Sequence, residues 1–152
     1  SDAERRIILL NSAYEQAQMI LDRNPMDHRA WTRALEINRE LAAYDGALAD
    51  DAIHDAKTLV NLLPGFWQAR TALAMSFVRL GRFEEALSAV KMAKDLNAMD
   101  FEGGNLTLYL EAVALRALGR NEDAIEAAKQ SLSIRYSTEA QALIDSLQSA
   151  AQ

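Results

Sequence analysis

Two eight-residue segments with closely matching patterns restrict what this chain can fold into more than any other feature. Residues 80–87 read LGRFEEAL, and residues 118–125 read LGRNEDAI. The glycine in each segment can take the left-handed conformation that closes a helix. The acidic residues that follow suit the first turn of a new helix, because exposed N–H groups there favour negative charge. Each segment therefore predicts a tight turn between two helices.

The composition agrees with a wholly helical chain. Ala, Leu, Glu, Arg and Lys make up 76 of the 152 residues, a proportion typical of packed helices, and only 2 Pro and 6 Gly are present. A chain of this length is expected to form one domain with a continuous core. No apolar run approaches the ~18 residues of a membrane-spanning helix, so we expect no membrane span.

The two turns belong to a longer repeat. Small residues that open the second helix of each expected pair follow one another at intervals of 39, 34 and 38 residues: Ala13, Ala52, Ala86 and Ala124. Twelve residues after the first two stand Pro25 and Pro64, where a helix must end. A 34-residue unit with insertions at 43–49 and 100–104 fits these intervals.

Residues 67–100 resemble a tetratricopeptide repeat. The residues in family-like positions are Ala69, Leu73, Ala74, Phe77, Gly81, Phe83, Ala86, Ala93 and Leu96. Residues 105–138 are similar through Leu108, Ala112, Leu115, Gly119, Ala124 and Ile134. The segment 28–64 matches less closely, although Trp31 fits.

The resemblance implies an all-α solenoid of antiparallel helix pairs, with about three repeats and roughly eight helices. We expect one domain, 1–152, divided into an N-terminal helix at 1–24, repeats at 28–64, 67–100 and 105–136, and a C-terminal capping helix at 137–152. Thr138, followed by Gln141 three residues later, has the pattern of a capping box that opens this last helix.

The first helix of each stacked pair is expected to line a concave groove. Helical spacing predicts which residues face it. They are Arg29, Thr32, Glu36 and Arg39 in the first pair, Gln68, Thr71, Met75, Val78 and Arg79 in the second, and Leu106, Tyr109, Val113 and Arg116 in the third. One end of this surface carries arginines and the other is apolar, which suits a peptide segment with apolar side chains and a carboxylate.

The last helix has an apolar stripe that needs a partner, formed by Ala140, Leu143, Ile144 and Leu147. We expect this stripe to cover the helix at 121–134. The alternative is that the last helix occupies the groove and competes with ligands.

Several kinds of chemistry are not expected. The net charge of −6 argues against a nucleic-acid partner, which requires clustered basic residues. The chain has no cysteine, so disulfides and zinc–thiolate sites are excluded. His28 and His54 lack the converging ligands that a metal site needs. The chain contains no nucleophile elbow and no phosphate-binding loop, so we expect no catalytic residue, no metal and no cofactor.

Some tetratricopeptide repeat proteins bind the acidic C-termini of chaperones through a clamp of Lys, Asn and Arg side chains. The matching positions here carry Thr32, Glu36, Ala72, Leu106 and Leu110, so this clamp is not expected.

The resemblance implies a protein–protein interaction module with a scaffold or adaptor role. Two alternatives stay open. The chain begins at Ser1 without a methionine, as an accessory domain cut from a larger enzyme or regulator would. The first helix also has an apolar stripe, part of which could form a homodimer: Ile7, Ile8, Leu10, Tyr14, Ala17 and Leu21.

Overall fold

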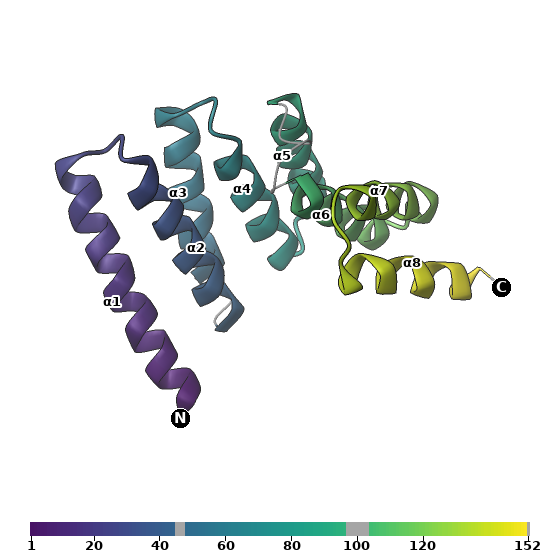
Figure 1. Ribbon diagram of the computed structural model, residues 1–152, viewed down its shortest axis with the longest axis horizontal. Helices are drawn as coiled ribbons and strands as arrows, with labels where there is room; N and C mark the ends of the chain where they lie inside the picture. Colours follow the sequence, from purple (N-terminus) through teal and green to yellow (C-terminus); the bar gives the residue numbers. More distant parts are fainter. Residues whose placement is uncertain (45–47, 97–103, 152) are drawn as a thin grey trace.

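A computed structural model describes residues 1–44, 48–96 and 104–151, and this part of the chain is helical throughout (Figure 1). Its helices are α1 (Asp2–Arg23), α2 (His28–Tyr44), α3 (Leu48–Leu62), α4 (Trp67–Arg79), α5 (Phe83–Asp95), α6 (Gly104–Ala117), α7 (Asn121–Ile134) and α8 (Thr138–Ala150). Residues 45–47 of the insertion predicted at 43–49, and residues 100–103 of the one predicted at 100–104, lie outside the described residues. Gly104 is buried where α6 begins.

The helices form two layers. Each helix packs against the next one along the chain, and α4 also contacts both α2 and α6. Helices α2, α4 and α6 therefore make one layer, with α3, α5 and α7 in the other. The helix axes change orientation along the chain: those of α1 to α4 are steep in Figure 1, whereas those of α7 and α8 lie across it. This arrangement confirms the predicted all-α solenoid.

Alanine at the contact positions lets the helices approach closely. These alanines are fully buried: Ala34, Ala56, Ala69, Ala74, Ala86, Ala93, Ala112, Ala114, Ala124, Ala128 and Ala140. Larger side chains such as Trp31, Leu73 and Phe77 fill the space between them. The buried residues form two clusters, one spanning α1 to α6 and one spanning α6 to α8.

The turn between α4 and α5 confirms the prediction made from its glycine. Gly81 has a φ of 72°, in the left-handed region. The Arg82 N–H donates to the Phe77 carbonyl at 2.8 Å, and the Gly81 N–H donates to the Val78 carbonyl at 3.1 Å. These two bonds define a Schellman motif, which satisfies carbonyls that the helix end would leave unpaired. The Arg82 guanidinium then donates two hydrogen bonds of 2.6 Å to the Glu85 carboxylate in the first turn of α5.

The turn between α6 and α7 has the same construction. Gly119 has a φ of 77°. The Arg120 N–H donates to the Leu115 carbonyl at 2.9 Å, and the Gly119 N–H donates to the Arg116 carbonyl at 3.0 Å. Arg120 also forms an ion pair of 2.9 Å with Asp123. The two matching sequence segments thus form two matching turns.

The start of α8 differs from the prediction by one residue. The N-cap is Ser137, whose hydroxyl accepts a hydrogen bond of 3.2 Å from the Ala140 N–H. Ser137 has the extended backbone that an N-cap residue requires, whereas Thr138 is already helical and donates its hydroxyl to Glu139. The Gln141 side chain, expected to complete a capping box, donates to Asp145 instead.

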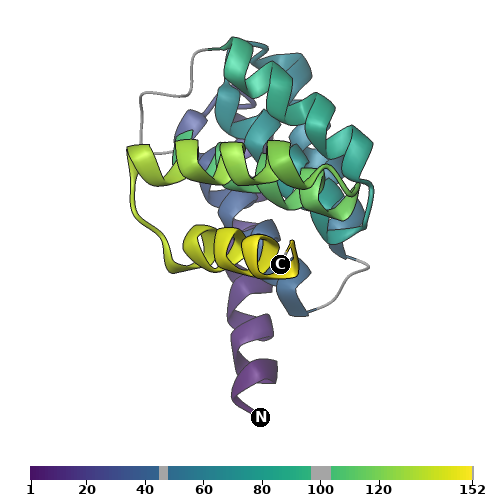
Figure 2. The same ribbon diagram turned by 90° about the vertical axis from the view of Figure 1, so that its right-hand side faces the viewer.

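Helix α8 lies against α7, as expected from its stripe. Leu143, Ile144 and Leu147 share a buried cluster with Ala124 and Ala127 of α7. Figure 2 shows the two helices side by side, with α8 ending near the C-terminus. Helix α8 therefore covers the end of the solenoid and does not fill the cavity between α2 and α4 described below.

A network of side-chain hydrogen bonds connects α1, α2 and α3. The Tyr14 hydroxyl of α1 donates to the Asp55 carboxylate of α3, and the Asn38 amide of α2 donates to the same carboxylate oxygen at 2.7 Å. Burial raises the pKa of the Tyr14 phenol to about 12, and the hydrogen bond to Asp55 adds to this rise. The protonated phenol is therefore favoured in the folded state.

Replacing Gly119 by Ala should lower the free energy of unfolding by about 1–2 kcal/mol, because alanine is strained at a positive φ. An added Cβ would meet nothing within 4 Å at this position, so the cost is conformational and not steric. Gly65→Ala is the matched control, because that glycine is equally open and its φ is not positive. Urea unfolding of both variants checks this, and equal losses of stability would contradict it.

The Tyr14 network predicts a pH dependence. The phenol ordinarily titrates near pH ~10, so the folded state holds a proton that the unfolded state has lost between about pH 10 and 12. The free energy of unfolding should therefore fall across this interval more steeply in the parent protein than in Tyr14→Phe. Chemical denaturation at several pH values measures this difference, with Tyr136→Phe, which removes an exposed phenol, as the control variant. Parallel profiles for the parent and Tyr14→Phe would rule the effect out.

Candidate functional site

A cavity of about 180 Å³ lies in the layer formed by α2, α4 and α6. Helices α2 and α4 supply most of its wall, and α3 and α6 contribute one residue each. The lining residues are Thr32, Leu35, Glu36, Arg39, Ala52, Trp67, Gln68, Thr71, Ala72, Met75, Ser76, Arg79 and Leu106. Engineered apolar cavities of ~150 Å³ hold a benzene molecule, so this space can take one side chain of moderate size.

The cavity gathers eight of the thirteen residues predicted to face the groove. These eight are Thr32, Glu36, Arg39, Gln68, Thr71, Met75, Arg79 and Leu106. They come together because α2 and α4 run in the same direction and present residues spaced three and four apart to the same space. Sequence reasoning did not place five lining residues in the groove: Leu35, Ala52, Trp67, Ala72 and Ser76. All of them except Ala52 lie one helical turn from a residue that it did place there.

The other five predicted residues lie elsewhere. Tyr109 and Val113 pack against the buried cluster that includes α8. Val78 packs against the cluster that spans α1 to α6. Arg29 and Arg116 are exposed and do not line the cavity. Two residues of the apolar end expected for the groove thus pack against the cluster of α6 to α8 and do not line the cavity.

Hydrogen bonds hold the polar side chains of the cavity wall. The Thr71 and Thr107 hydroxyls are 3.0 Å apart, are both buried, and connect α4 with α6. The Ser76 hydroxyl donates to the Ala72 carbonyl at 3.0 Å. The Gln68 Oε1 atom is buried, and no donor among the described residues reaches it. Such an oxygen costs free energy until a donor binds it.

The charged side chains of the cavity are Arg39, Arg79 and Glu36. Glu36 is 3.6 Å from Arg33, an exposed residue on the same helix. Burial lowers the pKa of Arg79 from its usual value, and the positive charge of Arg39 lowers it further. The two arginines therefore lie close enough to repel each other.

A second cavity, of about 470 Å³, lies between α5, α6 and α7. Four of its seven charged side chains form ion pairs within the protein. Lys94 is 2.9 Å from Glu111, and Arg120 is 2.9 Å from Asp123. This compensation leaves little demand for a charged ligand, so the cavity between α2 and α4 is the candidate site.

Trp31 and His28 contact neighbouring residues of the protein, and His54 lies on its surface. The Trp31 indole donates to the Pro25 carbonyl at 2.7 Å, and the His28 ring lies 5.2 Å from that of Phe66. His54 is exposed on α3. Within the described residues, no three His, Asp or Glu side chains converge as metal ligands would. None of the described helices is both long and apolar enough to cross a membrane.

Comparison of the sequence with family models and with curated proteins gave no match. Two solved structures are similar in fold. TTC0263, a thermophilic TPR protein of Thermus thermophilus, has a TM-score of 0.74 and 22% identity, over 93% of this chain and 74% of its own. A mutant of MamA has a TM-score of 0.56 and 16% identity, over 99% of this chain and 90% of its own. The chain thus has the tetratricopeptide repeat fold.

Proposed function

We propose that this protein is a protein–protein interaction scaffold whose inner helix layer binds a segment of a partner protein. The observation that carries this proposal is the cavity between α2 and α4, with its apolar lining residues Leu35, Met75 and Leu106. Concave, mostly apolar sites with a few polar groups are typical binding sites. The tetratricopeptide repeat fold supports a scaffold role in general.

We further propose that the protein is not an enzyme and that its partner is not a nucleic acid. The Thr71 and Ser76 hydroxyls of the cavity already take part in hydrogen bonds, and no histidine lines it. The net charge of −6 disfavours a polyanion as the principal ligand. The same surface would serve a free scaffold or an accessory domain of a larger enzyme or regulator.

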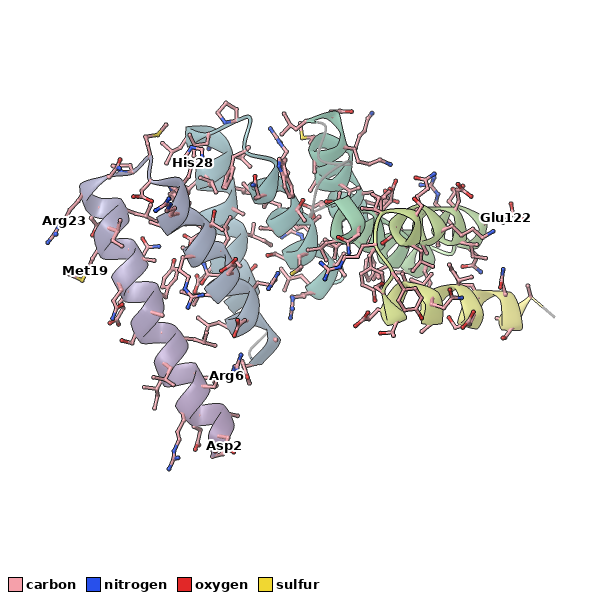
Figure 3. All side chains as sticks on the ribbon, in the orientation of Figure 1. Asp2, Arg6, Met19, Arg23, His28 and Glu122 are labelled. Carbon is pink, nitrogen blue, oxygen red and sulfur yellow. The ribbon has the colours of Figure 1, made fainter. Side chains whose placement is uncertain are left out.

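Helix α1 favours a second candidate function, the formation of a homodimer. The predicted stripe mostly faces inward, with Ala17 and Leu21 buried against the rest of the protein. Ile8 of this stripe is exposed (67%), as are three apolar residues outside the stripe: Leu9 (69%), Met19 (58%) and Ile20 (49%). Figure 3 shows Met19 and Arg23 on the side of α1 that faces away from α2. A second copy of the chain could cover this face.

Crosslinking from two methionine positions tests the scaffold proposal. A photoreactive amino acid replaces Met75, which lines the cavity, or Met92, which is 48% exposed on α5. We expect position 75 to crosslink a specific partner in cells, identified by mass spectrometry, and position 92 to yield much less of it. If only position 92 crosslinks the partner, the binding surface lies on the layer formed by α3, α5 and α7 instead.

The dimer is tested by light scattering of the purified chain over a range of concentrations. If α1 forms the interface, the molar mass should rise toward twice that of the monomer, and Leu9→Glu should return it to that of the monomer. The variant should fold normally, because the Leu9 side chain is mostly exposed. A monomer at every concentration would exclude this second function.

A further inference from the structure

Two arginines border the cavity without a carboxylate partner. Several other arginines of this protein do have one: Arg6 pairs with Glu40, Arg82 with Glu85 and Arg120 with Asp123. Within residues 1–44, 48–96 and 104–151, no ion pair includes Arg39 or Arg79.

Both of these arginine side chains line the same cavity. They belong to different repeats, Arg39 to α2 and Arg79 to α4, and the positive charge of one acts on the other. Partial burial and the positive charge of Arg39 both disfavour the charged form of the Arg79 guanidinium. A negatively charged group placed between the two would remove the repulsion and add charge-assisted hydrogen bonds.

The cavity itself supplies one negative charge, that of Glu36. Its carboxylate is 3.6 Å from the Arg33 guanidinium, so it is already engaged on the exposed side of α2. The lining therefore holds two positive charges against one negative charge, in a protein whose net charge is −6. This local excess of positive charge favours an acidic ligand.

Apolar lining residues lie next to both arginines. Leu35 precedes Arg39 by four residues, and Met75 precedes Arg79 by four, so each arginine neighbours an apolar residue one helical turn away. Neighbouring side chains at this spacing are ~5–6 Å apart. In an extended peptide, residues i and i+2 point the same way and are separated by ~6–7 Å. The two spacings are similar, so an extended peptide can place one side chain near each of the two lining residues.

We propose that the cavity binds an extended, acidic peptide segment of a partner protein. A Leu, Met or Phe side chain fills the apolar space beside Met75, and an Asp or Glu side chain two residues away lies between Arg39 and Arg79. The guanidinium groups donate hydrogen bonds to this carboxylate. The inference rests on the proposed scaffold function and specifies the sequence that the scaffold recognises.

Selection from a random dodecapeptide library tests the proposal. The library is tethered through its C-terminus, so only carboxylates of side chains can bind. The peptides enriched by the parent protein should share an apolar residue followed two positions later by Asp or Glu. The best peptide, made synthetically, should lose at least tenfold in affinity when its acidic residue becomes Asn or Gln.

Variants of the protein locate the binding site. Arg39→Ala with Arg79→Ala should weaken binding at least tenfold and abolish the preference for the acidic over the amide peptide. Glu36→Gln should bind the acidic peptide several-fold more tightly, because a like charge is removed. Arg29→Ala with Arg116→Ala is the matched control, since both arginines lie outside the cavity, and its affinity should be unchanged. Circular dichroism verifies that each variant is folded.

The possible outcomes distinguish failure of this inference from failure of the proposed scaffold function. Enriched peptides without an acidic preference, or an affinity unaffected by loss of Arg39 and Arg79, would overturn the inference and leave the scaffold function intact. A selection that enriches nothing would also overturn it, and crosslinking from position 75 would then decide whether the cavity takes part in protein binding at all.

Discussion

Close packing of helices at alanine is the constraint on which the rest of the structure depends. A single helix pair cannot bury its apolar face, so it must stack on the next pair. Fully buried residues such as Ala74 and Ala112 sit at these contacts, where the absence of a longer side chain sets how near two helices can lie. The same stacking places α2, α4 and α6 side by side and so creates the surface that holds the cavity.

The parts of the fold that depend on residues close together in the sequence could be predicted. The turns at Gly81 and Gly119 follow from a backbone preference of glycine and from helix electrostatics, both of which act over a few residues. The position of α8 follows from its apolar stripe, which had one suitable partner close in sequence. The sequence predicts the N-cap of this helix one residue late, because Thr138 has the capping-box spacing to Gln141, although Ser137 is the better capping residue.

The candidate site could be predicted less completely. Helical spacing named most of the residues on α2 and α4 that line the cavity, because side chains three and four apart share a face. It also predicted Tyr109 and Val113 to face the groove; these two residues do not line the cavity, and they pack against the buried cluster of α6 to α8. The repulsion between Arg39 and Arg79 depends on how two repeats stack, a property that no short segment of sequence contains.

The buried core is divided into two clusters, and this division affects which helices can unfold locally. The cluster against which Met75 and Leu106 pack spans α1 to α6, whereas Leu143, Ile144 and Leu147 belong to the cluster of α6 to α8. The two clusters share α6, and helix α8 contributes nothing to the cavity wall. Proteins open in cooperative units that follow such divisions. Fraying of α8 would then proceed from the C-terminus while the cavity keeps its shape, so a partner held there would not be released by it.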